Sequence, residues 1–165
     1  MHEHKKHAPR NVCVAVLSVS STRSIETDES GGWIKKNAVD AGHDVLLHQV
    51  VKDDMGAIGD AVAKCLKDGK IQAIILTGGT GIAHKDVTIE TVRPMLEKEL
   101  SGFGVLFTQL SYQQIGSAAM LSRATAGVSK NTLIFCIPGS LNACKLACNE
   151  LILPELGHLV KHLEE

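Results

Sequence analysis

The chain has few aromatic residues and no excess of positive charge. Of its 165 residues only five are Phe, Trp or Tyr, and 17 basic residues face 18 acidic ones, for a formal net charge of −1. Proteins that bind nucleic acid need a basic surface for the phosphate backbone, or aromatic rings on which bases stack. The composition therefore argues against a nucleic-acid partner.

Long apolar runs and a secretion signal are also missing. No run approaches the roughly 18 apolar residues that a membrane span requires, and the start "MHEHKKHAPR" lacks the apolar core of a signal peptide. We therefore expect a cytoplasmic protein with no membrane partner.

No Cys-x-x-Cys pair occurs among the five cysteines, which are scattered through apolar segments. This pattern predicts reduced, buried thiols. Cys144 and Cys148 are four residues apart, but no third metal ligand lies near them in the sequence, so we expect them to pack in the core. His158 and His162 share the same spacing, and a solvated helix face accounts for them.

Hydrophobic residues make up 44% of the chain, enough for the core of one globular domain. Nearly continuous apolar runs typical of strands covered on both faces occupy residues 12–20, 71–76 and 132–137, and residues 43–51 are expected to form a further strand. Segments that favour helix lie between and after them, at residues 33–41, 54–69, 89–100, 102–121, 141–151 and 154–163.

This alternation of strands and helices predicts an α/β fold, a three-layer sandwich around a mostly parallel central sheet. With no internal repeat or linker, residues 11–165 are expected to form a single domain. The polar, histidine-rich residues 1–10 are expected to be a disordered tail.

Three of the predicted strands end in loops rich in glycine and hydroxyl groups. The first loop contains Ser18 and Ser20, the second is "TGGTG" at residues 77–81, and the third is "PGS" at residues 138–140. Parallel strands place their carboxyl ends at one edge of a sheet, so the loops can line one pocket. Close backbone N–H groups and hydroxyls suit an anion such as phosphate.

The loop at residues 77–81 matches neither common phosphate fingerprint. A P-loop, G-x-x-x-x-G-K-[ST], that starts at Gly78 would need a second glycine where this chain has Ala83. A dinucleotide-binding loop, G-x-G-x-x-G, that starts at Gly79 would need its third glycine where this chain has His84. A generic nucleotide- or dinucleotide-binding domain is therefore disfavoured. The alternative is that these glycines only form a tight turn.

Carboxylates accompany the loops. Asp86 follows Gly81 by five residues, and Asp53 and Asp54 follow the second predicted strand. Two acids beside an anion pocket suit Mg²⁺ bound to a polyphosphate. The alternative is that they cap helices, which explains Asp54 and Asp86 better than Asp53.

Several segments together are specific. "SVSSTRS", "LTGGTGIAHKDVT", "GFGVLF", "LSRATAGV" and "IPGS" resemble the molybdenum cofactor biosynthesis protein B family and its sister, molybdopterin adenylyltransferase. The resemblance spans residues 12–163, implies a molybdopterin-binding-like fold, and is closer to protein B in the C-terminal half.

The resemblance implies a reaction. Active members use Mg²⁺ and ATP to adenylylate molybdopterin, whose terminal phosphate attacks the α-phosphorus of ATP and displaces pyrophosphate. By position, Asp53 and Asp86 are the catalytic acids, with Asp86 as the Mg²⁺ ligand, while Arg123 contacts either substrate or a carboxylate. The residues expected to bind nucleotide or pterin are Ser20, Thr77, Gly78, Gly79, Thr80, Gly81, Ser122, Pro138, Gly139 and Ser140.

One departure from the family leaves an alternative open. Active relatives have Pro-Asp-Glu where this chain has Lys52-Asp53-Asp54, and some members of the protein B branch lack the acids. A non-catalytic molybdopterin-binding or carrier protein is therefore the alternative.

The family also implies partners. A homo-oligomer, either trimer or hexamer, is expected, together with contact with the downstream molybdate-inserting enzyme. The segment at residues 102–112 carries Phe103, Phe107, Leu110 and Tyr112, which suit a subunit interface or the core equally well.

Overall fold

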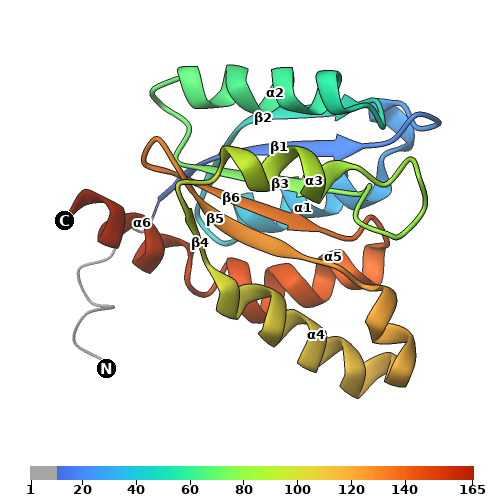
Figure 1. Cartoon of the computed structure of the whole chain (residues 1–165). Helices are drawn as coiled ribbons and strands as arrows, with labels where there is room; N and C mark the ends of the chain where they lie inside the picture. Colours follow the sequence, from blue (N-terminus) through green and yellow to red (C-terminus); the bar gives the residue numbers. More distant parts are fainter. Residues whose placement is uncertain (1–10) are drawn as a thin grey trace.

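The computed structural model describes residues 11–165, which form one six-stranded sheet covered by helices on both faces (Figure 1). The expectation of a disordered tail at residues 1–10 lies outside the described residues. The strands are β1 (Cys13–Val19), β2 (Asp44–Val51), β3 (Ala73–Thr77), β4 (Lys98–Glu99), β5 (Thr125–Ser129) and β6 (Thr132–Ile137). The longer helices are α1 (Glu29–Asp40), α2 (Met55–Lys67), α3 (Thr88–Val92), α4 (Ser101–Ile115), α5 (Leu141–Ala147) and α6 (Leu156–Glu164).

The strand order is β2-β1-β3-β6-β5-β4. Strands β2, β1, β3 and β6 are parallel, whereas β5 is antiparallel to both β6 and β4. The chain passes from β1 to β2 in one direction and then to β3 on the other side of β1, so the order reverses between β1 and β3. Such a switch point opens a crevice at the carboxyl ends of the strands.

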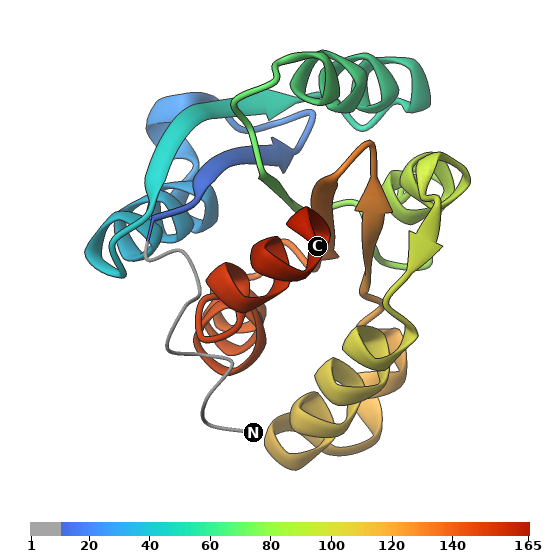
Figure 2. The ribbon, with the colours of Figure 1, turned by 90° about the vertical axis from the view of Figure 1, so that its left-hand side faces the viewer.

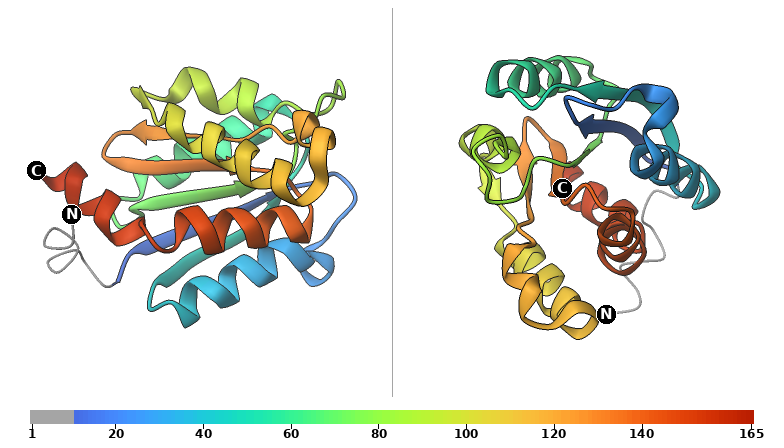
Figure 3. Two further views of the ribbon diagram at one scale, coloured as in Figure 1. Left: turned by 90° about the horizontal axis from the view of Figure 1, so that it is seen from below. Right: turned by 90° about the vertical axis from the view of Figure 1, so that its right-hand side faces the viewer.

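The helices form the two outer layers. Helices α1, α4, α5 and α6 pack on one face and α2 and α3 on the other, as the end-on and underside views show (Figures 2 and 3). The predicted three-layer α/β sandwich is therefore confirmed. None of the helices within residues 11–165 has the length and apolar run needed to cross a bilayer.

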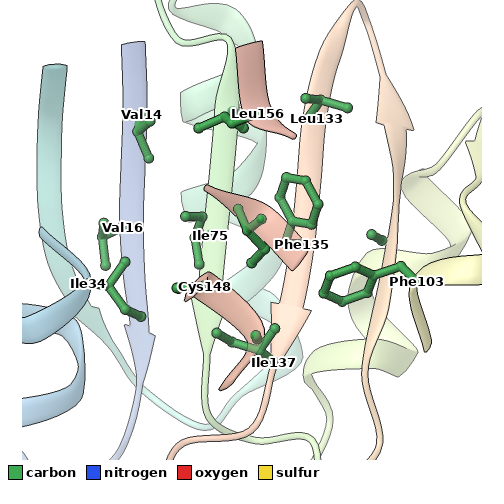
Figure 4. Close-up of a cluster of buried hydrophobic side chains, with 14 of the residues drawn as sticks. Val14, Val16, Ile34, Ile75, Phe103, Leu133, Phe135, Ile137, Cys148 and Leu156 are labelled. Carbon is green, nitrogen blue, oxygen red and sulfur yellow. The ribbon is translucent and has the colours of Figure 1, made fainter. Parts of the chain in front are cut away.

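Alternating strand residues supply the two cores. On the larger one, Val14, Val16 and Ile75 of the sheet meet Phe135 and the ring of Phe103 from α4 (Figure 4). The next residue along each strand points to the opposite cluster, because side chains alternate across a sheet. Burial on both faces explains the continuous apolar runs in the sequence.

Two expectations about the elements are wrong. The helix expected over residues 89–100 is shorter, because α3 ends at Val92. A 3₁₀ turn at Arg93–Met95 follows, in which Pro94 lacks the backbone N–H that a continuing α-helix requires. The chain then forms β4, and the N–H groups of Glu97 and Leu100 donate to Val128 and Ala126. Strand β5 was not expected at all, and it joins β6 through a turn at Lys130 and Asn131, both at positive φ.

Helix α1 also begins earlier than the expected residue 33. It starts at Glu29 because the carboxylate of Asp28 accepts a hydrogen bond from the backbone N–H of Gly31 and caps the helix. Residues 29–32, which were expected to belong to a loop, thus form the first turn of the helix.

Candidate functional site at the carboxyl edge of the sheet

Three loops enclose a cavity of about 450 Å³ at the carboxyl ends of β1, β3 and β6. The predicted site residues that line it are Ser20, Asp53, Gly78, Gly79, Thr80, Gly81, Asp86, Ser122, Pro138, Gly139 and Ser140. The structure therefore brings together residues up to 120 positions apart, at the strand-order reversal where ligands bind in this class of sheet.

Hydrogen bonds to its carbonyl oxygens hold the β3–α3 loop at residues 78–81. Gly78 and Gly79 have φ values of 101° and 66°, a region that glycine adopts without strain. Their carbonyl oxygens accept hydrogen bonds from the side-chain hydroxyl and the backbone N–H of Thr88, at 2.8 and 3.0 Å.

The N–H of Gly78 donates to the carbonyl oxygen of Ile137 at 3.0 Å, whereas the other N–H groups of this loop are unused. Within residues 11–165, the backbone N–H groups of Gly79, Thr80 and Gly81 donate to no protein acceptor. Successive free N–H groups in a glycine-rich turn form a concave anion-binding site.

Hydrogen bonds from two buried hydroxyl groups position the β6–α5 loop at residues 138–140. Thr77 donates its hydroxyl to the carbonyl oxygen of Pro138 at 3.0 Å, and Ser30 donates to that of Gly139 at 2.9 Å. Thr77 is buried and does not line the cavity, so among the predicted binding residues it supports the loop instead of facing a ligand.

The carboxylates of Asp53 and Asp86 line the cavity, whereas that of Asp54 does not. Asp54 accepts a hydrogen bond from the N–H of Ala57 at 2.8 Å and caps α2, as its position predicted. Asp53 accepts from the N–H of Ser21 at 2.7 Å. Asp86 accepts from the N–H of Ala83 at 2.9 Å, behind it in the chain, and is not the cap of α3.

The two acids fit a hard cation bound together with phosphate. Each uses one carboxylate oxygen, Oδ2, for its backbone hydrogen bond, and the Oδ1 atoms have no protein donor within residues 11–165. No three His, Cys, Asp or Glu side chains of that part of the chain converge on one point. Mg²⁺ commonly takes one or two carboxylates and completes its shell with substrate phosphates and water.

Arg123 fixes the loop at residues 78–81 from outside. Its guanidinium donates to the carbonyl oxygens of Thr80 and Gly81 at 2.9 and 2.8 Å, and it pairs with Glu90. The hydrogen bond from Arg123 lowers the pKa of Glu90. Of the two roles left open for Arg123, the structure shows pairing with a carboxylate and, in addition, a loop contact.

A buried acid–imidazole pair lies behind the β6–α5 loop. His48 Nε2 lies 2.7 Å from Asp28 Oδ2, and both side chains are nearly inaccessible. The Ser18 hydroxyl is buried nearby and does not reach the geometry of a hydrogen bond to any described residue. Burial raises the pKa of Asp28, but the contributions of the Ser18 hydroxyl, His48 and the Gly31 N–H outweigh it, so the pKa is lowered.

Two basic residues of the cavity were not anticipated. Arg23 and Lys85 line it, and neither forms an ion pair with another described residue. Cations without protein partners beside free N–H groups favour an anionic ligand. The signal was present in "SSTRS" and "HKDVT", where each basic residue adjoins a predicted site residue or loop.

Comparison with known proteins agrees with this geometry. The family described as "Probable molybdopterin binding domain" matches residues 15–158. A relative from Bacillus subtilis named "Molybdenum cofactor biosynthesis protein B" is 47% identical over 166 residues, covering 100% of this chain and 98% of its own length.

Solved structures agree as well. A crystal structure of a molybdenum cofactor biosynthesis protein B superimposes with a TM-score of 0.92 at 44% identity, covering 96% of this chain and 99% of its own. The tungsten cofactor synthesizing protein MoaB from Pyrococcus furiosus gives a TM-score of 0.86 at 34% identity, covering 96% and 100%. The chain therefore belongs to the molybdenum cofactor biosynthesis protein B family.

Proposed function

We propose that this protein is a molybdopterin adenylyltransferase of molybdenum cofactor biosynthesis, with Mg²⁺ and ATP as cofactor and co-substrate. The observation that supports it most is the cavity itself. Free N–H groups of Gly79, Thr80 and Gly81 share it with the carboxylates of Asp53 and Asp86. A phosphate cradle beside two acids suits nucleotidyl transfer better than binding of an uncharged ligand.

In the proposed reaction, an oxygen of the terminal phosphate of molybdopterin forms a bond to the α-phosphorus of ATP. The bond from that phosphorus to the α–β bridging oxygen breaks, and pyrophosphate leaves. Such a transfer needs positioning and charge neutralisation more than covalent participation by the protein. The loop at residues 78–81 binds nucleotide phosphates, and Arg23 and Lys85 add positive charge.

Asp86 would hold Mg²⁺ in the cavity that Asp53 also lines. When bound, this ion neutralises the charge of the phosphates and of the leaving pyrophosphate. Ser122 and Ser140 would bind the phosphate or pterin of molybdopterin, since both line the same cavity.

Replacement of the acids tests this proposal. Asp86→Asn is expected to lower Mg²⁺-dependent formation of adenylylated molybdopterin about 100-fold or more, because an essential charge is lost. Asp54→Asn is the matched control: it changes the neighbour of Asp53, keeps the cap of α2, and should leave the rate nearly unchanged. A wild-type rate in Asp86→Asn would contradict the role of Asp86.

The second candidate is a molybdopterin-binding or carrier protein without catalysis. It is favoured by Lys52 beside Asp53, where active relatives have proline. Calorimetry separates the two functions. An adenylyltransferase binds ATP with Mg²⁺ in the cavity, whereas a carrier binds molybdopterin and releases no heat with ATP.

A homo-oligomer, trimer or hexamer, is also part of the proposal. Phe103 and Phe107 lie in the core, so the sequence ambiguity at residues 102–112 is resolved for them. Other apolar side chains remain exposed on the outer side of α4 and the following turn, namely Val105, Leu106, Tyr112, Ile115, Met120 and Leu121. Exposed apolar surface of this extent is typical of a subunit interface.

A further inference from the structure

Helix α6 carries two histidines whose rings face each other. His158 and His162 lie one helical turn apart, where side chains become neighbours. Their ring centroids are 4.6 Å apart and their Nε2 atoms only 3.0 Å apart. The spacing alone indicated a solvated face, and the structure adds the convergence of two nitrogen atoms.

Each ring is backed by a carboxylate. The Nδ1 atom of His158 lies 3.1 Å from Glu155 Oε2, and that of His162 lies 3.1 Å from Glu165 Oε2. When both Nδ1–H groups donate to these carboxylates, both Nε2 atoms present lone pairs. Two lone pairs at 3.0 Å repel unless they share a cation, which is either a proton or a metal ion.

A carboxylate behind each imidazole is the arrangement that orients histidines in metal sites and makes them better ligands. With metal–nitrogen bonds of about 2.0–2.1 Å, a separation of 3.0 Å between the nitrogens corresponds to an N–metal–N angle of about 94°. This angle is narrower than the tetrahedral value of structural zinc sites and close to the right angle of tetragonal Ni²⁺ or Cu²⁺ sites.

We propose that His158 and His162 form a two-imidazole site for a divalent transition-metal ion of the Ni²⁺ or Cu²⁺ type. No third His, Cys, Asp or Glu of residues 11–165 converges on the same point, so water completes the shell. Both rings are partly exposed, which leaves room for water ligands.

The site is separate from the phosphate cavity. Helix α6 lies at the amino ends of the parallel strands, where Val160 and Leu163 adjoin Gln72 and Thr132 (Figure 1). A bound ion would link the last two turns of a helix whose Leu156 and Val160 belong to the core. The proposal does not depend on adenylyl transfer.

Calorimetric titration with Ni²⁺ at pH 7.5 tests the site, using full-length protein purified without an affinity tag. His2, His4 and His7 are first replaced by Asn, because imidazoles at these positions can bind Ni²⁺ independently. In this background we expect one Ni²⁺ per chain and a rise in melting temperature with Ni²⁺. His158→Gln should weaken binding at least tenfold, and Glu165→Gln about tenfold.

A spacing control separates chelation from simple histidine content. The double variant His158→Gln/Lys161→His keeps two histidines but makes them adjacent, so that they point in different directions from the helix. We expect it to bind Ni²⁺ as weakly as His158→Gln. The site would be overturned if the parent and the spacing variant bound Ni²⁺ with equal affinity, or if His158→Gln lost less than threefold in Ni²⁺ affinity. The contact between the two rings would then be explained by a shared proton.

Discussion

Gly78 is the residue at which the backbone constrains the site most. Its φ of 101° is unfavourable for any residue with a side chain, and a Cβ there would collide with the carbonyl oxygen of Val19. We expect Gly78→Ala to lower the free energy of unfolding by about 2–4 kcal/mol. Urea denaturation measures this change.

Gly32→Ala is the control for that substitution. Gly32 lies within α1, and a Cβ built on it meets nothing within 4 Å. The added methyl group should raise the free energy of unfolding by about 0.5–1 kcal/mol, because it removes the flexibility of glycine in a helix. Equal destabilisation by both substitutions would show that Gly78 is not specially constrained.

Asp28 links stability to pH. Its pKa is lowered in the folded state, so the unfolded state binds more protons in acid. The stabilisation is therefore complete above the unfolded pKa, about 3.9, and is lost as pH falls through the lower folded value. Asp28→Asn keeps an acceptor for the helix cap but removes the charge beside His48.

We expect Asp28→Asn to cost about 1–3 kcal/mol at pH 7, because a neutral amide replaces the carboxylate in the buried contact with His48. The difference from wild type should shrink as the pH falls below about 3.9, because the carboxylate of Asp28 is then protonated as well. Denaturation curves at a series of pH values check this. A difference that stays constant with pH would mean that the carboxylate charge plays no part.

At the scale of elements, Arg123 connects the loop before β5 to the loop at residues 78–81. It donates to two loop carbonyl oxygens and pairs with Glu90 of α3. Arg123→Gln is expected to raise the KM for ATP about tenfold, since the loop N–H groups lose their fixed direction. The KM and kcat from initial rates test this expectation.

Arg93→Gln provides the matched arginine control. Its ion pair with Glu99 is exposed, and neither residue lines the cavity. Exposed pairs contribute about 0–1 kcal/mol, so neither KM nor stability should change appreciably. If Arg93→Gln raised KM as much as Arg123→Gln, the loop contacts of Arg123 would not be the cause.

Four of the six strands could be predicted from the sequence. Strands β1, β3 and β6 are apolar runs buried on both faces, and β2 has enough apolar residues to be recognised although it is partly exposed. Strand β5 could not, since Val128 is the only β-branched apolar residue of its "TAGVS". Strand β4 has only two residues, both exposed, and exists because of its pairing with β5. Pairing between distant segments leaves little local signal.

At the scale of the whole molecule, the exposed apolar side of α4 is the expected subunit interface. Tyr112 is 63% exposed and Met120 is 80% exposed. A charge placed in an apolar interface opposes association, so Tyr112→Glu should reduce the mass measured by light scattering to that of a smaller species. Val39→Glu, at a 52% exposed position of α1, should leave the mass unchanged.

An oligomer with the same mass in wild type and Tyr112→Glu would place the interface elsewhere. A monomeric wild type would contradict the proposed oligomer altogether.

The candidate site was largely predictable from the topology, because strand ends of a parallel sheet must meet at one edge. Asp53, Asp86 and the glycines of residues 78–81 were therefore expected together. The supporting contacts were not predictable: Ser30 reaches Gly139 across 109 residues, and Asp28 meets His48 through the packing of α1 on β2. Such contacts depend on side-chain positions that no local pattern specifies.

The most direct test of the account is a single-turnover assay with purified protein, molybdopterin, Mg²⁺ and ATP. Adenylylated molybdopterin is quantified per chain for wild type, Asp53→Asn and Asp86→Asn. We predict product from wild type and loss of product from both variants, with molybdopterin binding retained. No product from wild type that still binds molybdopterin would contradict the adenylyltransferase and support the carrier.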